Sequence, residues 1–382
     1  MTRPQGETPR VKRLILKDFR SYAALDLAVS RPLVALVGEN GAGKTNLVEA
    51  LSLFAPGRGL RRADLGDMAR NGARSFAVSL ALDGADGERR LGVGLDPDEG
   101  GRAQRRCRID GADAPSAAAF AEYVRLVWLT PDLDGLFRGS AGDRRRFLDR
   151  LVLAIDARHG VRVNALERAL RSRNRLLEEA YGDQAWLDAV ERELAELAVA
   201  IVSARRETVD RLDAQLLAGR NDASPFPHAR LALAGELDEL VATAPAVDAE
   251  DRYRALLRDN RGRDAAAGRT LVGPQATDLQ VRHGPKDLPA ELCSTGEQKA
   301  LLLGLVLGHA RLVRAMSGIA PLVLLDEVAA HLDPGRRAAL YDALVELGGQ
   351  VWMTGADPTL FSDLGSRADL LQVTPGQASR AA

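Results

Sequence analysis

The segment from Gly38 to Thr45 constrains the fold of this chain more than any other. It reads G-E-N-G-A-G-K-T, which fits the pattern G-x-x-x-x-G-K-[ST], and an apolar run, Leu33–Val37, comes directly before it. Amphipathic spacing after Lys44 predicts a helix. A strand, a glycine-rich loop and a helix in this order form the phosphate-binding loop of nucleotide-binding proteins. The sequence therefore predicts an α/β fold of the P-loop type.

Each part of this loop has an expected role. The glycines allow backbone N–H groups to turn inward around a phosphate, and the start of the helix adds the positive end of its dipole. We expect Lys44 to reach the β- and γ-phosphates of ATP and the Thr45 hydroxyl to bind Mg²⁺. The predicted nucleotide-binding residues are Gly38, Glu39, Asn40, Gly41, Ala42, Gly43, Lys44 and Thr45.

A second motif follows the strongly apolar run Leu322–Leu325, where the chain continues with Asp326 and Glu327. A carboxylate at the end of a buried strand would lie beside the phosphate loop and hold Mg²⁺ through water, and the adjacent Glu327 would polarise the attacking water as a general base. An acidic turn after a core strand is common by itself, but its pairing with the loop favours a site. The sequence thus predicts Glu327 and Lys44 as catalytic residues and Thr45 and Asp326 as metal-binding residues.

A third motif, S-T-G-E-Q from Ser294 to Gln298, lies ahead of the Asp-Glu strand and opens a predicted helix. Alone it also fits a helix N-cap followed by a favourable Glu. The order of the three motifs, with Asp333 six residues after Glu327, resembles the ATP-binding-cassette class. In that class the serine and glycine touch the γ-phosphate of ATP held by another subunit. The resemblance therefore implies nucleotide contacts for Ser294, Gly296 and Asp333 and a dimer that encloses ATP between its heads.

The composition excludes several other classes of protein. A hydrophobic fraction of 46% and a charged fraction of 27% over 382 residues are typical of a soluble globular protein, and a net charge of -1 gives no global field for nucleic acid or membrane. Cys107 and Cys293 form no C-x-x-C pair, which fits a reducing cytosol. No apolar run approaches the roughly 20 residues that span a bilayer. We expect a cytoplasmic protein without a membrane partner.

The remaining patterns predict the elements around these motifs. Predicted strands are Val11–Lys17, Leu33–Val37, Ser75–Leu82, Arg89–Leu95, Arg105–Ile109, Val124–Leu129, Arg269–Val272, Thr277–Val281, Pro321–Leu325, Gln350–Met353 and one near Leu370. A helix is predicted from about Gly296 to Met316. We predict that residues 1–141 and 261–382 form one ATPase head.

Residues 142–260 are predicted to form a helical lobe inserted into that head. A heptad-like seam runs through Leu187, Val190, Leu194, Leu197, Ile201, Ala204 and Thr208. The charged residues between them, Glu191, Arg192, Glu193 and Glu196, are expected on the other face. A helix of about 30 residues is only about 45 Å long. The seam therefore favours a packed helical hairpin over an extended coiled-coil arm.

Several further motifs together resemble the RecF family of bacterial recombination mediators. They are Leu14-x-Leu16-x-Asp18-Phe19-Arg20-Ser21-Tyr22, the loop region from Gly38 to Ala50, Pro131-Asp132-Leu133, Gly139-Ser140, Arg144 to Asp149, and Ser294 to Lys299. The resemblance covers nearly the whole chain. The chain departs from the family's G-P-H-R-D-D-L motif, because it has Gly273-Pro274-Gln275-Ala276-Thr277-Asp278-Leu279. The chain therefore lacks the His and the Arg of that motif.

Membership of that family would imply a weak, DNA-stimulated ATPase in recombinational DNA repair and replication. Such a protein dimerises on ATP, clamps DNA at gaps or at duplex–single-strand junctions, hydrolyses ATP slowly for release, and works with the mediators RecO and RecR. The chain itself offers an Arg-rich stretch suited to phosphate contacts, which is Arg144, Arg145, Arg146, Arg150, Arg158, Arg162, Arg168, Arg171, Arg173 and Arg175. A solvated helix face with Glu167, Glu178 and Glu179 as counter-charges is the alternative. An aromatic content of 4% favours backbone contacts over base stacking.

Two other functions fit parts of the pattern. The first is the nucleotide-binding subunit of a transporter, but Thr354-Gly355-Ala356-Asp357 stands where transporter cassettes carry a His, and the helical insertion is large. The second is an SMC-like or nuclease-associated ATPase. A short helical lobe and the absence of a C-x-x-C hook disfavour the long-armed versions. A nuclease-linked relative stays open on the sequence alone.

Overall fold

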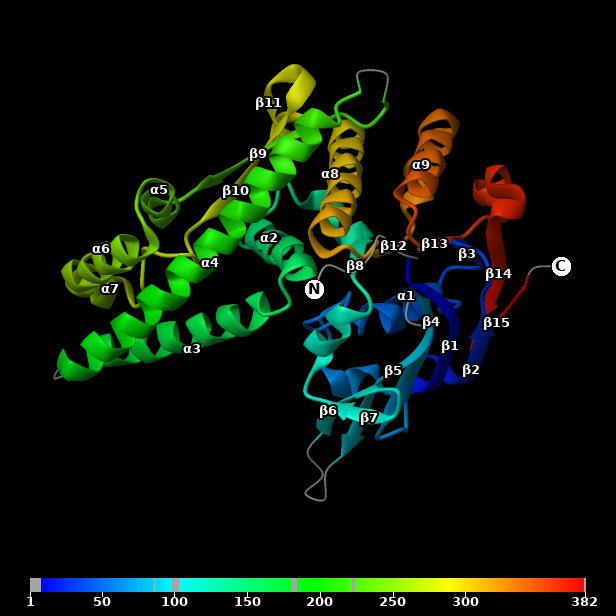
Figure 1. The fold of residues 1–382 in the computed structure, drawn as a ribbon, viewed down its shortest axis with the longest axis horizontal. Helices are drawn as coiled ribbons and strands as arrows, with labels where there is room; N and C mark the ends of the chain where they lie inside the picture. The colour runs from blue at the N-terminus through cyan, green and yellow to red at the C-terminus, as the bar shows by residue number, and fades with distance from the viewer. Residues whose placement is uncertain (1–7, 85–86, 98–102, 180–183, 222–223, 381–382) are drawn as a thin grey trace. The chain divides into compact units, whose positions relative to one another are not determined.

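The computed structural model describes residues 8–84, 87–97, 103–179, 184–221 and 224–380 (Figure 1). Internal contacts divide the chain into two compact units. The head unit comprises Met1–Asp134, Asn221–Pro227 and Leu302–Ala382, and the lobe unit comprises Gly135–Arg220 and His228–Leu301. The sequence predicted an inserted helical lobe at residues 142–260, and these domain borders stay a prediction.

The strand that leads into the phosphate loop lies inside a six-stranded sheet of the head unit. In pairing order the strands are β15 (Gln377–Arg380), β14 (Ala368–Thr374), β3 (Leu33–Val37), β13 (Val351–Gly355), β12 (Leu322–Leu325) and β8 (Leu126–Leu129). All pairs are parallel except that of β14 with β15. Strands β3, β13, β12 and β8 are buried along their whole length, as parallel strands covered on both faces are. Residues that follow β3, β12 and β13 therefore meet at one edge.

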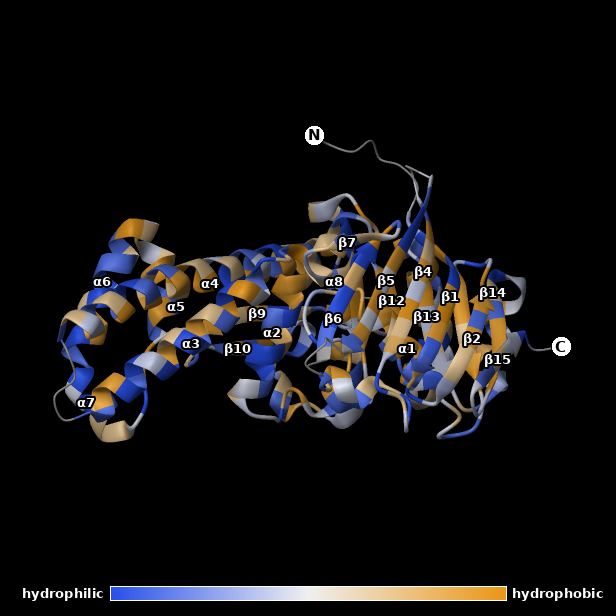
Figure 2. Ribbon diagram, turned by 90° about the horizontal axis from the view of Figure 1, so that it is seen from below, coloured by the Kyte–Doolittle hydropathy of each residue, from blue (hydrophilic) through white to orange (hydrophobic). Residues whose placement is uncertain are grey.

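A second, antiparallel sheet completes the head unit. Its strands, in pairing order, are β2 (Tyr22–Ala28), β1 (Arg10–Phe19), β4 (Phe76–Gly84), β5 (Gly87–Pro97), β6 (Ala103–Ile109) and β7 (Ala112–Ala114). Buried and exposed residues alternate along β2 and β4, so one face of this sheet faces the core. Helix α1 (Lys44–Ser52) contributes Leu47, Val48 and Leu51 to the same core as residues of both sheets. Figure 2 shows apolar residues along β4, whereas β6 is mostly hydrophilic.

The lobe unit consists mainly of helices. They are α2 (Ala141–Ile155), α3 (His159–Glu178), α4 (Gln184–Ala218), α5 (Glu236–Thr243), α6 (Ala246–Asp259) and α7 (Arg261–Ala267). A small antiparallel sheet of β11 (Leu288–Pro289), β10 (Asp278–His283) and β9 (Ala229–Ala234) accompanies them. Helix α4 has 35 residues and packs along α3, and residues of α3, α4, α5 and α6 share one apolar core. The predicted helical hairpin is therefore confirmed, with a longer second helix.

Two further helices flank the Asp-Glu strand. Helix α8 (Thr295–Ser317) precedes it and α9 (Pro334–Leu347) follows it. Among the described residues, α8 alone is long and apolar enough to cross a membrane, and 67% of its apolar window is buried inside the protein. The expectation that no apolar run approaches a spanning length was wrong, because α8 buries apolar residues on nearly every side as a core helix.

Short 3₁₀ helices fill several connections: η1 (Leu65–Met68), η2 (Ala117–Glu122), η3 (Pro131–Gly135), η4 (Gly284–Lys286), η5 (Ala290–Leu292), η6 (Val328–His331) and η7 (Pro358–Arg367). Most predicted strands are present within a few residues of their expected ends. The predicted strand Arg269–Val272 is wrong, because Thr270 N–H bonds the Asn174 side chain and Leu271 N–H bonds the Asp264 carboxylate in place of a neighbouring strand. Strands β2, β7, β9, β11 and β15 were not predicted.

Candidate functional site

The backbone of the predicted phosphate loop has the conformation that its glycines allow. Gly38, Gly41 and Gly43 all have positive φ, at 157°, 84° and 108°. A Cβ at Gly43 would lie 2.8 Å from the Tyr22 hydroxyl oxygen, and one at Gly38 would collide with the carbonyl oxygen of Val373. The loop is thus packed tightly at both ends, and only glycine fits at these two positions. Glu39, Asn40 and Gly41 are exposed at its tip, whereas Ala42 is buried.

Lys44 is the first residue of α1, and its side chain turns back to contact the loop. Its Nζ donates hydrogen bonds to the carbonyl oxygens of Gly38, at 2.7 Å, and Glu39, at 2.8 Å. Burial lowers the pKa of the ammonium, while the charges of Glu327 and Asp326 act in the opposite direction. The predicted catalytic lysine therefore contacts the loop and is close enough to the two carboxylates that follow β12 to feel their charges.

The side chain of Asp326, which ends β12, meets the loop directly. Thr45 Oγ1 donates to Asp326 Oδ1 at 3.1 Å, and Thr354 Oγ1 donates to the same oxygen at 2.7 Å. Burial raises the pKa of this carboxyl, the Glu327 charge adds to the rise, and the two hydroxyl bonds oppose it. The two residues predicted to bind metal, distant in sequence, are therefore in contact.

Glu327 has an unusual backbone. Its φ of 56° and ψ of 16° place a non-glycine residue in the left-handed region. Its N–H donates to Thr354 Oγ1 at 2.9 Å. Thr354 was not predicted as a site residue, although its position at the end of β13, between β3 and β12, is the signal that could have found it. The structure thus adds one hydroxyl to the predicted site.

The oxygen atoms at this edge suit Mg²⁺. A hydroxyl from Thr45 and a buried carboxylate from Asp326 are hard ligands, which Mg²⁺ prefers. Asp326 and Glu327 are adjacent acids, and the Asp326 carboxylate accepts hydrogen bonds from the hydroxyl groups of Thr45 and Thr354. A cation here would relieve the like charges that raise the Asp326 pKa.

The family-like opening of the chain contacts the helix after the loop. Glu49 of α1 is 0% exposed and accepts two hydrogen bonds from Arg20, at 2.6 and 2.9 Å, and one from Arg61 at 2.8 Å. The Tyr22 hydroxyl donates to the carbonyl of Gly43 at 3.2 Å. Residues at the turn between β1 and β2 therefore bond both the phosphate loop and α1, which gives the opening motif a physical role.

Ser294 and Glu297 form a reciprocal capping box at the start of α8, within the lobe unit. Ser294 N–H and Oγ both donate to Glu297 Oε2 at 2.9 Å, and Glu297 N–H donates to Ser294 Oγ at 3.4 Å. An ion pair with Lys286, together with the Ser294 bonds, lowers the pKa of Glu297 to about 2. Ser294 therefore caps α8, as the N-cap interpretation of this motif predicts. Ser294 and Gly296 are also exposed, and a phosphate contact stays a prediction.

Asp333 has a local partner as well. Its Oδ1 accepts the N–H of Arg336 at 2.9 Å and so caps α9, which begins at Pro334. Proline at the first position of a helix is favourable because its missing N–H would have no partner there. The predicted nucleotide contact of Asp333 is therefore an additional role, and it stays a prediction.

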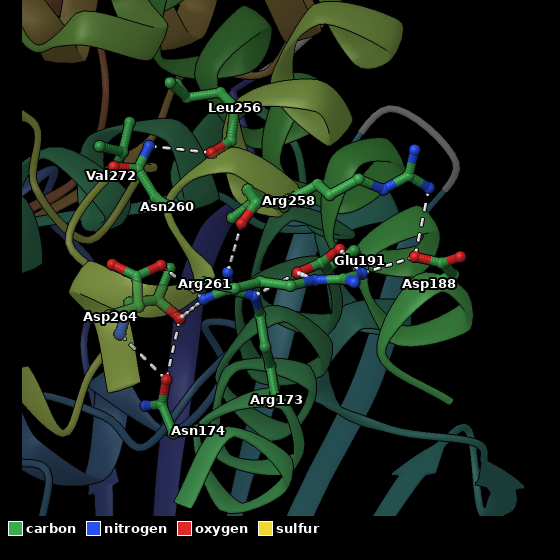
Figure 3. Close-up of polar contacts among 12 residues, drawn as sticks. Arg173, Asn174, Asp188, Glu191, Leu256, Arg258, Asn260, Arg261, Asp264 and Val272 are labelled. Carbon is green, nitrogen blue, oxygen red and sulfur yellow. Dashed lines mark hydrogen bonds and ion pairs between the residues drawn. The ribbon is translucent and has the colours of Figure 1, made fainter. Parts of the chain in front are cut away.

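The Arg-rich stretch divides into buried and exposed members. Arg173 is 0% exposed, so the expectation that it contacts DNA is wrong. Its guanidinium bonds Glu191 at 2.9 Å, Asp264 at 2.7 Å and the carbonyl of Leu257 at 2.7 Å (Figure 3). Glu191, expected on the solvated face of α4, is likewise buried. A second arginine, Arg261, also pairs with Glu191.

Other arginines of this stretch have partners on the lobe. Arg144 forms a double hydrogen bond with Asp278, at 2.8 and 2.7 Å, and Arg145 donates to the carbonyl of Thr277 at 2.8 Å. In contrast, Arg168, Arg171 and Arg175 of α3 are exposed, and no ion pair joins them to another described residue. These three are the best placed of the stretch for an external phosphate.

The altered segment Gly273–Leu279 is held by the lobe itself. Arg205 donates to the carbonyl of Pro274 at 2.7 Å, and the Gln275 side chain donates to the carbonyl of Val272 at 3.0 Å. Thr277 Oγ1 donates to Asp238 at 2.6 Å. Gln275, which replaces the family's His, therefore makes a local bond that stabilises the segment.

Comparison with known proteins identifies the family. The model described as "RecF/RecN/SMC N terminal domain" matches residues 10–378. A protein of Mesorhizobium japonicum named "DNA replication and repair protein RecF" is 54% identical over 367 residues, covering 96% of each chain. A protein of Rhizobium meliloti with the same name is 54% identical over 368 residues, covering 96% of this chain and 98% of its own. The chain belongs to the RecF family. The predicted membership is therefore confirmed, and with it a place among proteins of DNA replication and repair.

Solved structures support the same fold. A structure titled as the recombination mediator protein RecF with ATPrS, in the RecFOR pathway, matches with a TM-score of 0.86 at 20% identity, covering 99% of both chains. An Smc head domain from Pyrococcus furiosus matches with a TM-score of 0.54 at 18% identity, covering 98% of this chain and 96% of its own. The predicted α/β fold of ATP-binding-cassette type is confirmed by the RecF family and its structural neighbours. RecF membership favours the repair hypothesis over a transporter subunit.

Proposed function

We propose that this RecF-family chain is a slow, DNA-stimulated ATPase that binds DNA in an ATP-dependent way, and that ATP joins two copies into a clamp at gaps or junctions. The observation that carries the proposal is the contact between Thr45 and Asp326 at 3.1 Å beside Lys44 and the glycine loop. This arrangement unites a phosphate cradle, an ammonium and two acids at one edge of the sheet. The names of the relatives support a role in DNA replication and repair.

Each residue of the site would have a separate role in hydrolysis. The loop N–H groups and Lys44 bind and orient the phosphates, and Thr45 and Asp326 would hold Mg²⁺. That ion supplies charge neutralisation at the phosphates when it is bound. Glu327 accepts a proton from the attacking water at its carboxylate, because it is the acid next to the Asp326 site. The buried Asp326 carboxylate is held at the metal-binding edge by its bonds from Thr45 and Thr354.

The second half of each ATP site would come from another copy. Ser294 and Gly296 are exposed at the start of α8, where N–H groups and the helix dipole favour an anion. Ser294 has one hydroxyl proton, which it now donates to Glu297. Contact with a γ-phosphate would redirect that proton, so ATP would both join the two copies and loosen the capping box. Asp333 would lie close to the same nucleotide, as in the cassette class.

DNA would bind through Arg168, Arg171 and Arg175. These residues are three and four positions apart on α3, so their side chains lie on one face of the helix. Exposed guanidinium groups that form no ion pair with another described residue suit the phosphate backbone, and α3 carries no aromatic group to stack a base. A duplex or a duplex–single-strand junction is therefore the expected partner. We further propose RecO- and RecR-type mediators as partners, which the RecFOR pathway named for the solved relative supports. A cytoplasmic location is also part of the proposal.

Sedimentation of the Glu327→Gln protein tests this function. The carboxamide keeps the shape of the side chain but cannot accept the proton, so we expect stalled hydrolysis and a shift from monomer to dimer with ATP and Mg²⁺, strengthened by gapped duplex DNA. The matched control is Glu346→Gln, which makes the same change on an exposed position of α9 and should hydrolyse ATP normally. An unchanged mass at saturating ATP would contradict the clamp, and a normal rate for Glu327→Gln would contradict the assigned base.

A further inference from the structure

Thr354 lies at the centre of the edge where the proposed ATP site forms. Strand β13, which carries it, pairs with β3 on one side and β12 on the other. The phosphate loop follows β3, and the two acids follow β12. Thr354 is 1% exposed. Its hydroxyl is therefore enclosed by the strands that support both halves of the site.

This single hydroxyl joins two adjacent residues. It donates its only proton to Asp326 Oδ1 at 2.7 Å and accepts the N–H of Glu327 at 2.9 Å. The directions are fixed, because a backbone N–H can only donate and an ionised carboxylate can only accept. The hydroxyl thus fixes the Asp326 side chain and the peptide that leads into Glu327 at the same time.

The backbone at Glu327 needs a hydrogen bond to hold its conformation. Glu327 adopts the left-handed conformation with φ of 56°, which is unfavourable for a residue with a Cβ and persists only where the surroundings hold it. The Thr354 hydroxyl is the partner of its N–H. A change at Thr354 would free this backbone to relax, and the Glu327 carboxylate would lose its fixed direction.

We propose that Thr354 is a positioning residue of the hydrolysis site, which sets the direction of the Glu327 carboxylate through the bond to its backbone. The inference rests on the proposed ATPase function. It predicts that Thr354 affects the rate of hydrolysis and leaves nucleotide affinity nearly intact, because neither of its two bonds involves the phosphate loop. Misplacement of a catalytic group by about 1 Å can slow an enzyme by up to about 100-fold.

Two substitutions at Thr354 separate the hydroxyl from the packing. Thr354→Val keeps the shape and removes the hydroxyl, and Thr354→Ser keeps the hydroxyl and removes a methyl group. Thr130→Val is the matched control, since Thr130 follows the neighbouring strand β8, is buried, and has a hydroxyl without a hydrogen-bond partner among the described residues. We expect single-turnover hydrolysis to fall about 10-fold to 100-fold in Thr354→Val and to remain near normal in the other two variants.

A double substitution tests whether Thr354 acts through Glu327. If it does, Thr354→Val should cost little further rate in the Glu327→Gln protein, because the base is already lost. Nucleotide affinity and thermal unfolding are measured for every variant. We expect the affinity of Thr354→Val to stay within about 3-fold of normal, because the phosphate contacts are intact.

Several results would overturn the inference. They are a normal rate in Thr354→Val, equal losses in Thr354→Val and Thr354→Ser, a full further loss in the double variant, or a loss explained by weakened nucleotide binding or by unfolding. The proposed function fails separately: an unsubstituted protein that binds no ATP, or hydrolyses none with gapped DNA, would overturn it, and this inference with it.

Discussion

Arg173 and Glu191 form an ion pair at 2.9 Å between side chains that are 0% and 3% exposed. The same guanidinium bonds Asp264 and two further oxygens, so one arginine holds together α3, α4, α6 and α7 (Figure 3). The lobe therefore depends on a buried charge network as well as on its apolar core. This network contains Glu191, which the sequence assigned to a solvated helix face.

Removing the guanidinium should destabilise the lobe strongly. Arg173→Met leaves the buried Asp264 without this cation and removes one of the two arginines that pair with Glu191. Breaking a buried ion pair in this way typically costs about 3–5 kcal/mol. Arg171→Met, an exposed neighbour on the same helix, should change the free energy of unfolding by less than about 0.5 kcal/mol. Urea unfolding, followed by circular dichroism, measures both. Equal stability of the two variants would contradict the network's role.

A glycine at position 294 should separate capping from nucleotide contact. Glycine is an acceptable N-cap, so Ser294→Gly should cost only about a few tenths of a kcal/mol in stability. It has no hydroxyl for a phosphate, so ATP should no longer join two copies. Sedimentation with ATP and Mg²⁺ is the measurement, and the background is Glu327→Gln. A variant that still dimerises fully would show that the Ser294 hydroxyl acts only in the capping box.

Lys44 should not tolerate arginine. Its ammonium is buried and lies 2.7 Å and 2.8 Å from two loop carbonyl oxygens, a space that suits a point charge and not a planar fork. We expect Lys44→Arg to weaken ATP binding about 10-fold or more, as measured by calorimetry. Lys17→Arg, an exposed position on β1, is the control and should bind ATP normally. Unchanged affinity in Lys44→Arg would remove the lysine from phosphate binding.

DNA affinity should depend on salt through three arginines. Replacing Arg168, Arg171 and Arg175 with Gln should weaken duplex binding and reduce the slope of log affinity against log salt by about 3. The control carries the same charge change on α4, at the exposed residues Arg192 and Arg211 and at the half-buried Arg206. Fluorescence anisotropy over a range of salt concentrations compares them. If both triple variants behave alike, DNA binds elsewhere.

The stability of the lobe should fall in acid because of Asp149. Burial alone would raise the pKa of this carboxyl, but bonds from His159 and Arg205 outweigh it and lower the pKa to about 2, from 3.8. A depressed pKa in the folded state stabilises it above pH 3.8, and this contribution, about 2 kcal/mol, is lost as the pH falls toward 2. Asp149→Asn should unfold more easily at pH 5 and lose part of the acid dependence. A parallel pH profile for both proteins would contradict this prediction.

The nucleotide-site residues were easier to predict from the sequence than the residues that hold them in place. The motifs of Lys44 and Asp326 follow fixed spacings beside apolar strands, so their meeting at one sheet edge follows from topology alone. Thr354 carries no such spacing, because its role depends on which strand lies between β3 and β12. Sequence patterns do not contain that order.

The buried charges of the lobe were missed for a different reason. Charged residues are rarely buried without partners, so Glu191 was assigned to solvent, although it lies four residues after Leu187 and three before Leu194 in the apolar seam. Arg173 lies four residues after the buried Ala169. Opposite charges on the apolar faces of two adjacent helices are the signal that would have indicated the pair.

The pairing of β3 has a consequence for synthesis. This strand ends at Val37, yet its two neighbours, β13 and β14, begin at Val351 and Ala368. A ribosome therefore releases the phosphate loop long before the strands that hold it. The emerging chain therefore cannot assemble the sheet edge that carries Lys44, Asp326 and Thr354 until its last strands are free.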